Sequence, residues 1–186
     1  MLSLGEKTSL EKQTFERGVM FPIYKSIKLG TGLYTPSHFR EALEIAGCKN
    51  SEWSTLTMDQ NEFHILSQKL EIDLVNVSPE DLGLLPRGEN DPLRNRHIYE
   101  KGLELGLELC PAEVGPQLRL QYLDQPEGEL LLIAMKPIYV CSRGRYRAFV
   151  VGKIANDNLL DCYNGHPEDT RATNCRIIFS RKRITG

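Results

Sequence analysis

The sequence predicts an α+β fold, with about three helices packed on a mostly antiparallel sheet that ends in a C-terminal four-strand meander. Helical spacing of apolar residues dominates between residues 35 and 122, whereas alternation with a period of two dominates after residue 128. Helices followed by a run of strands with short turns are typical of α+β proteins rather than of alternating α/β proteins. We expect residues 21–186 to form this single domain, after a polar N-terminal arm or short helix over residues 1–20.

The first elements of the domain are a strand and a helix. Residues Phe21–Leu29 alternate apolar and polar side chains, which predicts a half-buried strand. Thr35 is a good N-cap, and Pro36 suits the first helical position. Four apolar residues then recur with helical spacing, and Gly47 is a typical stop signal. A helix over residues 36–46 is therefore expected.

The middle of the chain is expected to contain two further helices. Asp91, followed by proline, starts the first of them, and Gly106 ends it. Cys110 stands at the cap position of the second, and apolar residues at every fourth position carry that helix to Tyr122. The segments before these helices are expected to form a turn over 50–59, strands over 63–66 and 70–77, and a helix start over 78–81.

The last third of the chain has the pattern of strands joined by hairpins. The tripeptides Ser-Arg-Gly and Asn-Asp-Asn are typical of short hairpin turns, and Asn-Gly-His-Pro is typical of a longer loop. Consecutive strands with such connections predict an antiparallel meander. The four strands are expected over residues 129–140, 145–154, 158–163 and 174–181.

Composition indicates a globular protein whose core needs no metal or disulfide. The chain has 186 residues, of which 40% are hydrophobic and 26% are charged, close to the average for soluble domains. A chain of this length buries roughly 70% of its unfolded surface. The five cysteines are odd in number and lack a Cys-x-x-Cys pair, so neither a disulfide framework nor a zinc site is expected. Reduced thiols and the absence of a long apolar segment predict a cytoplasmic protein with no membrane contact.

Three residues are weak candidates for catalysis: His166, Cys110 and Glu113. His166 is predicted to lie in a loop rich in carboxylates, where an acid can orient a histidine as a general base. Cys110 is expected at a helix N-terminus, which stabilises a thiolate, although the neighbouring Glu108 opposes that effect. Glu104, Glu108 and Glu113 are candidates for paired carboxylates. Each residue also has a structural interpretation, as a solvated loop histidine, a buried thiol or a surface glutamate. The scattered histidines predict no metal site, and no motif predicts a cofactor.

The C-terminal part of the chain is basic, and its arginines are candidates for binding anions. Residues 1–137 hold 14 Lys and Arg against 21 Asp and Glu, whereas residues 138–186 hold 9 against 4. Alternation within a strand would place Arg143, Arg145 and Arg147 on one face and Tyr146 on the other, which disfavours a stacking platform. If the last strand is a neighbour, the two strands form a positive face for a phosphate backbone. The alternative is an edge strand protected by charge. The candidates on or after the last strand are Arg176, Arg181, Lys182 and Arg183.

The central block GLELCPAEVGPQLRLQY, followed by DQPEGELLLIAMKPI, carries a resemblance. Together with EIDLVNVS, SPEDLG and IIFSRK, it resembles a recurrent group of short uncharacterised bacterial proteins, frequent in candidate-phylum and metagenomic sequences, over residues 21–182. Aromatic residues are frequent near the end of such proteins, where this chain has Leu160, Arg171 and Arg176. The resemblance implies no activity, cofactor or catalytic residue.

Three hypotheses about function follow from these patterns. The first is a non-catalytic, cytoplasmic binding or accessory module of bacterial type, with a macromolecular partner that the sequence does not identify. The second is a nucleic-acid-binding protein that contacts the phosphate backbone through its basic C-terminal strands. The third is a small hydrolase or nuclease organised around Glu108, Glu113 or His166.

Overall fold

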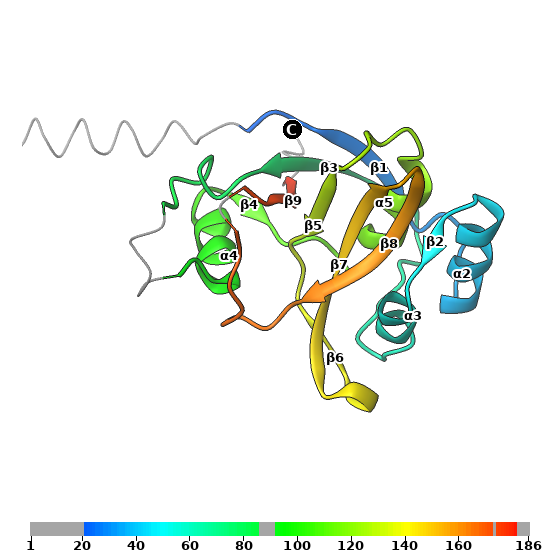
Figure 1. Ribbon diagram of the computed structural model, residues 1–186. Helices are drawn as coiled ribbons and strands as arrows, with labels where there is room; N and C mark the ends of the chain where they lie inside the picture. The colour runs from blue at the N-terminus through cyan, green and yellow to red at the C-terminus, as the bar shows by residue number, and fades with distance from the viewer. Residues whose placement is uncertain (1–20, 86–91, 173, 182–186) are drawn as a thin grey trace, which may run out of the picture.

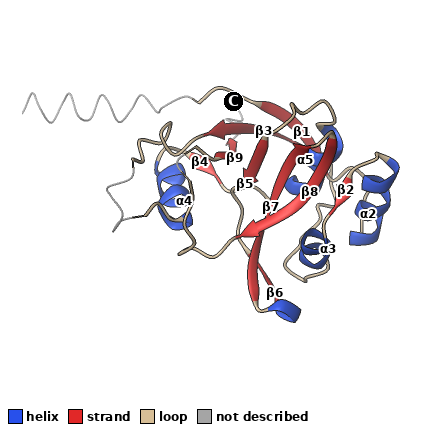
Figure 2. Ribbon diagram, viewed as in Figure 1, coloured by secondary structure: helices blue, strands red, loops and turns tan. Residues whose placement is uncertain are grey.

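The computed structural model describes residues 21–85, 92–172 and 174–181. Within them the chain forms an α+β fold, as predicted, in which one mixed sheet curves into a half-barrel (Figures 1 and 2). The described residues contain four α-helices rather than about three. The arm predicted over residues 1–20 and the basic residues Lys182 and Arg183 lie outside the described ranges.

The elements alternate irregularly along the chain. The helices are α2 (Pro36–Ile45), α3 (Glu52–Met58), α4 (Asn95–Glu104) and α5 (Val114–Gln121), with a short 3₁₀ helix, η1 (Cys141–Arg143). The strands are β1 (Lys25–Leu29), β2 (Lys49–Asn50), β3 (Leu70–Val77), β4 (Leu107–Glu108), β5 (Leu130–Ile133), β6 (Ile138–Val140), β7 (Arg145–Ile154), β8 (Asp157–Asn164) and β9 (Arg176–Arg181).

The sheet is mixed, and its last strand departs from the predicted meander. The strand order is β1-β3-β9-β5-β7-β8-β2, with β4 paired to β9 and β6 paired to β7. Strand β9 does not pair with β8; it lies between β3 and β5, and it runs parallel to β5. Its residues Ile177, Ile178 and Phe179 are all buried, against two different clusters. A strand that is apolar on both faces is stable where both faces of the sheet are covered. Because β9 pairs with β3 and β5 and not with β8, the predicted four-strand meander is wrong.

Helix α5 lies against one face of the half-barrel and is buried on all sides. It contacts β1, β7, β8 and α2, and every residue from Val114 to Arg119 is buried. A helix buried around its whole circumference occupies the centre of a core rather than its surface. Gly115 permits the close approach, because a Cβ atom there would lie 2.5–2.6 Å from the side chain of Phe149. The opposite face of the sheet packs against α4 through Phe179 and Ile98.

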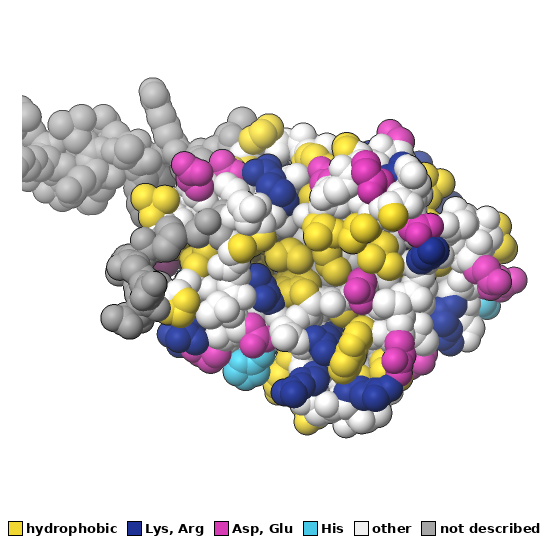
Figure 3. All heavy atoms as spheres, viewed as in Figure 1, with side chains coloured by type: hydrophobic (Ala, Val, Ile, Leu, Met, Phe, Trp, Pro, Cys, Tyr) yellow, Lys and Arg dark blue, Asp and Glu magenta, His cyan; other side chains and the backbone are white. Residues whose placement is uncertain are grey.

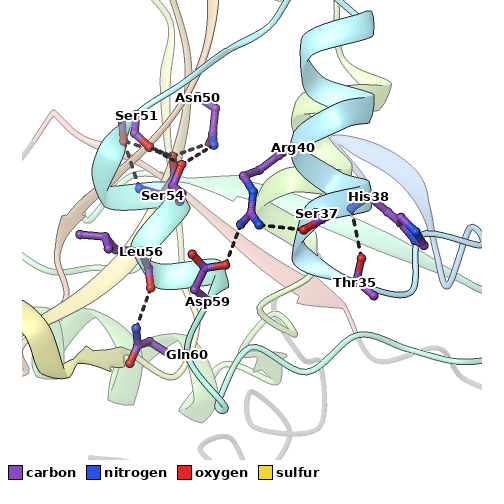
Figure 4. A network of polar contacts seen from close by, with 11 residues as sticks. Thr35, Ser37, His38, Arg40, Asn50, Ser51, Ser54, Leu56, Asp59 and Gln60 are labelled. Carbon is purple, nitrogen blue, oxygen red and sulfur yellow. Dashed lines mark hydrogen bonds and ion pairs between the residues drawn. The ribbon is translucent and has the colours of Figure 1, made fainter.

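Helix α3 replaces the turn that was predicted over residues 50–59. Ser51 is its N-cap, and its hydroxyl oxygen accepts a hydrogen bond from the Ser54 N–H at 3.1 Å (Figure 4). Ser54 and Thr57 are fully buried, and the Ser54 hydroxyl donates to Asn50 Oδ1 at 2.6 Å. Serine and threonine are weak helix formers, so tertiary contacts rather than propensity stabilise this helix.

Other boundaries differ from the prediction by a few residues. Helix α5 begins at Val114 and not beside Cys110, because the Cys110 N–H donates to Ala134 O at 2.7 Å and keeps the chain extended there. Helix α4 begins at Asn95, where the backbone N–H donates to Asp169 O at 3.0 Å. Residues 63–66, predicted as a strand, are irregular, and 78–81 form a turn. Helix α2 was predicted to within one residue.

The free edge of β1 is covered by one side chain of α5. The Lys28 N–H donates to Gln121 Oε1 at 2.9 Å, and Gln121 Nε2 donates to Lys28 O at 2.8 Å. The Gln121 amide therefore makes the two hydrogen bonds that a neighbouring strand would make. Unpaired edges promote pairing with other chains, and this contact removes two such groups.

Candidate nucleic-acid interface

The β6–β7 hairpin extends from the body of the sheet and carries aromatic and basic side chains (Figure 1). In the space-filling view, dark-blue and yellow side chains lie side by side over β6 and β7, at the lower end of the molecule (Figure 3). The 3₁₀ helix η1 joins the two strands, and Gly144 follows it with a φ of 61°. Glycine adopts this left-handed conformation without strain, which allows β7 to begin at once at Arg145.

Three exposed rings form a row on this hairpin and the loop after β8. Tyr139 and Tyr146 are cross-strand partners, with ring centroids 5.0 Å apart. The ring of His166 lies 5.5 Å from that of Tyr146. Tyr139 is 40% exposed and Tyr146 is 42% exposed, so both rings are partly accessible to a ligand. We call Tyr139, Tyr146 and His166 the aromatic row.

A small hollow of about 170 Å³ lies beside the aromatic row. It is lined by Gly144, Arg145, Tyr146, Asn164, His166 and Asp169. Alternation along β7 predicts Arg145 and Tyr146 on opposite faces, yet both reach this hollow because they lie at the exposed start of the strand. Arg145 is exposed and makes no ion pair with any described residue. Its guanidinium is therefore free to bind an anion.

Arg147 is fixed in place rather than free. Its guanidinium lies 3.6 Å from the centroid of the Trp53 ring, and its Nη1 donates to Asn164 Oδ1. Burial lowers the pKa of this guanidinium, and the charge of Arg145 adds to the effect. Such a cation–π contact stabilises the base of the hairpin, so Arg147 orients Asn164 at the hollow.

Arg143 does not share a strand face with Arg145 and Arg147, because it lies in η1 and the strand starts only at Arg145. Its guanidinium forms an ion pair with Glu52 of α3. Both side chains of this pair are at least half exposed, so the pair contributes little to stability and opens readily.

The arginines of β9 do not extend this surface. Strand β5 lies between β7 and β9, so the two basic strands are not neighbours. Arg176 pairs in register with Leu131 of β5, and Leu131 pairs with Val151 of β7. Val151 is six residues, or about 20 Å, along β7 from Arg145, so Arg176 is at least that far from Arg145 along the strand direction. Arg176 donates to Asn76 Oδ1 at 2.9 Å and forms an ion pair with Asp81. Arg181 is at the opposite end of β9 from Arg176, where it pairs in register with Leu107 of β4 and Asp73 of β3.

Cys110 is a buried structural thiol in this fold. Its side chain donates to Ile178 O at 3.5 Å, and the residue is 4% exposed. Complete burial raises the pKa of the thiol well above its ordinary value. The thiolate is the nucleophilic form, so the position disfavours covalent chemistry.

Glu113 is fully buried, where the sequence favoured a surface glutamate. Its Oε1 accepts hydrogen bonds from Gly30 N at 2.8 Å and Gln117 Nε2 at 3.0 Å, and its Oε2 accepts from Leu66 N at 2.8 Å. Glu108 lies exposed on β4, and His166 lies in the loop after β8, where its Nδ1 accepts from Glu168 N at 3.2 Å. The structure thus places the three proposed hydrolytic residues on separate elements.

The sequence patterns did not single out Tyr139, Trp53 or Asn164, whereas Asp169 was among the carboxylates expected beside His166. Tyr139 carried a usable signal, because it and Tyr146 each lie two residues from the four-residue turn over 141–144 and therefore pair across a hairpin. Trp53 and Asn164 carried none, because long-range packing alone brings α3 and the end of β8 to the hairpin.

Among the described residues, no group of three or more His, Cys, Asp or Glu side chains is placed to hold a metal ion. No helix within these same ranges is both long enough and apolar enough to cross a membrane. The chain matches no protein-family model, and no curated protein or solved structure is significantly similar to it.

Proposed function

We propose that this protein is a non-catalytic module that binds single-stranded nucleic acid through the β6–β7 hairpin. The observation that carries the proposal is the hollow that joins the unpaired Arg145 to the exposed rings of Tyr146 and His166. Proteins that bind single strands combine positive charge along the backbone with aromatic faces on which bases stack.

The geometry favours a single strand over a duplex. The rings of the aromatic row are exposed and tilted relative to one another, so unstacked bases can lie against them, whereas paired bases present only their edges. Arg145 supplies an unpaired positive charge at the rim, and Arg143 becomes available when its exposed pair with Glu52 opens. All five cysteines are free thiols, which supports a reducing, cytoplasmic location as part of the proposal.

Fluorescence anisotropy with labelled DNA and RNA single strands of about 12 nucleotides tests the proposal. The logarithm of the association constant is expected to fall linearly with the logarithm of salt concentration. Tyr146→Ala removes a stacking face and is expected to weaken binding about tenfold. Arg145→Ala is expected to reduce the salt slope by about 1.

The chain offers matched controls for both variants. Tyr34 is 65% exposed and lies in the loop before α2, so Tyr34→Ala is expected to leave affinity unchanged. Arg176→Ala removes an arginine from β9, the other basic strand. It therefore tests whether binding depends on the β6–β7 hairpin or on β9. The proposal fails if no single strand binds at low salt, or if Arg176→Ala weakens binding while Arg145→Ala does not.

A further inference from the structure

A second hollow, of about 270 Å³, lies among three loops, one of which leads into β6. The loops are residues 62–66, which precede β3, residues 110–112, which precede α5, and residues 136–138, which enter β6. Its walls are mostly apolar and are formed by Ile65, Leu66, Ala112, Pro137 and Ile138. Concave apolar sites with a few polar groups at the rim are typical of small-molecule binding sites.

The walls of this hollow are held in place by buried hydrogen bonds. The Glu113 carboxylate accepts from the Leu66 N–H at 2.8 Å and fixes the first loop against the start of α5. The Cys110 N–H donates to Ala134 O at 2.7 Å, and the backbones of Cys110 and Met135 form an isolated parallel β-bridge. These bonds hold the three loops together through the chain's own atoms, so binding does not require ordering of the loops.

The polar groups of the hollow lie at its rim and include one unpaired cation. Glu62, His64 and Lys136 are the polar side chains that line it, and all three are exposed. The Lys136 ammonium forms no ion pair with Glu62 or with any other described residue. Glu62 and His64 belong to the same loop, and the His64 N–H donates to Glu62 O at 3.0 Å. The rim therefore offers one free positive charge on the side of β6.

We propose that this hollow binds a small carboxylic acid with an apolar body, with the carboxylate on Lys136 and the apolar chain against Leu66, Ala112 and Ile138. Its volume is slightly below the range of about 300–1,000 Å³ that accommodates drug-sized ligands, so the ligand is small. A carboxylate complements the Lys136 ammonium, which forms no ion pair with the other rim residues. This site shares no lining residue with the hollow beside the aromatic row.

Isothermal titration calorimetry with octanoate tests the site, with 1-octanol and octylamine as probes that share the chain and change the head group. Octanoate is expected to bind about tenfold more tightly than 1-octanol, and octylamine more weakly than either, because it brings a second cation to Lys136. Amide chemical-shift changes in the folded protein are expected to be largest at Leu66, Ala112 and Ile138. Equal affinity for octanoate and octylamine overturns the proposal, as does a shift map centred on another surface.

Two variants separate the charge from the cavity. Lys136→Met keeps the length of the side chain and is expected to lower octanoate affinity about tenfold, to the level of 1-octanol, while 1-octanol binding is unchanged. Lys28→Met, at an exposed lysine of β1, is the matched control and is expected to have no effect. Ala112→Phe fills the hollow and is expected to abolish binding of both ligands. If Lys136→Met leaves octanoate binding unchanged, the assignment of the carboxylate to Lys136 is wrong.

Discussion

The buried carboxylate of Glu113 accepts a hydrogen bond from the backbone N–H of Leu66 at 2.8 Å, and so joins the loop before β3 to the start of α5. The same side chain accepts from Gly30 N, at the end of β1. One acidic residue thus holds together three segments that are far apart in the sequence. A carboxylate suits this position because, when ionised, it only accepts hydrogen bonds.

Replacement of Glu113 by glutamine is expected to destabilise the protein by about 1–3 kcal/mol. The glutamine amide has one acceptor oxygen, and its NH₂ group would face a backbone donor that has lost its partner. Urea unfolding followed by circular dichroism measures this free energy. Glu108→Gln, at an exposed position on β4, is the control and is expected to change stability by less than about 0.5 kcal/mol. Equal losses of unfolding free energy in the two variants would contradict the hydrogen bond from the Leu66 N–H to Glu113.

Arg119→Met is expected to cost about 3 kcal/mol of stability, although it preserves most of the side-chain volume. Arg119 is fully buried, and burial lowers the pKa of its guanidinium. Its Nη1 donates to Gln125 Oε1 at 2.6 Å and to Gly152 O at 2.8 Å, and its Nη2 donates to Tyr122 O. Methionine leaves these acceptors buried and unpaired.

The matched surface variant is Arg40→Met, which breaks an exposed pair with Asp59 and is expected to cost less than about 1 kcal/mol. Figure 4 shows this pair between α2 and the end of α3. Denaturant midpoints of the two variants, compared at constant m-value, measure the two losses of stability. A loss at Arg119 no larger than the loss at Arg40 would show that the buried hydrogen bonds are not formed in solution.

The five thiols are expected to react with a thiol reagent in a fixed order. Cys141 is exposed, so it is expected to be modified first in the folded protein. Burial raises the pKa of Cys162 to about 12 and also raises the pKa of Cys110, and both thiols therefore stay protonated and slow. Mass spectrometry after a short exposure to iodoacetamide identifies the modified residues. Cys110 is expected to be labelled only under unfolding conditions, and rapid labelling of Cys110 in the native protein would contradict its burial.

Stability is expected to fall as the pH rises above about 10, the pKa of tyrosine in unfolded chains. Burial raises the pKa of Tyr24, and its hydrogen bonds with Tyr122 and Glu129 raise it further. Burial also raises the pKa of Tyr163. The folded state therefore keeps protons that the unfolded state loses. The contribution of these tyrosines to the free energy of unfolding is fully present below about pH 10 and decreases above it.

Urea unfolding across this alkaline range measures the decrease, and Tyr24→Phe tests its origin. The variant is expected to be less stable near neutral pH, because Glu129 loses a hydrogen bond at 2.9 Å. Above about pH 10, its stability is expected to fall less steeply than that of the parent protein, because one fewer phenol is protected. Parallel curves for the two proteins would exclude Tyr24 as a source of the pH dependence.

The sequence predicted elements whose signals are local and failed where distant contacts decide. Helix α2 was located correctly because its cap, its proline and its apolar period all lie within twelve residues. Helix α3 was missed because Ser54 and Thr57 are stabilised there by burial against the sheet rather than by helix propensity. The predicted position of β9 was wrong because the residues next to β9 in the sequence do not determine that it pairs with β3 and β5.

The candidate surface was anticipated only in part, for the same reason. Arg145 and His166 were identified from the sequence, and the structure places both at one hollow. Arg176 carries the same charge, but strand order separates it from β7. Charge and residue type can be read along the chain, whereas the distance between Arg145 and Arg176 depends on which strand lies between them.

The insertion of β9 between β3 and β5 has a consequence for how the chain folds. Among the described strands, β9 alone connects the β1–β3 pair to the group formed by β5, β7, β8 and β2. As the chain emerges from the ribosome, these two groups can each form, but they leave an open gap with two unpaired edges until residues 176–181 are made. The final strand therefore closes the sheet, and a chain truncated before Arg176 is expected to expose both edges and to aggregate.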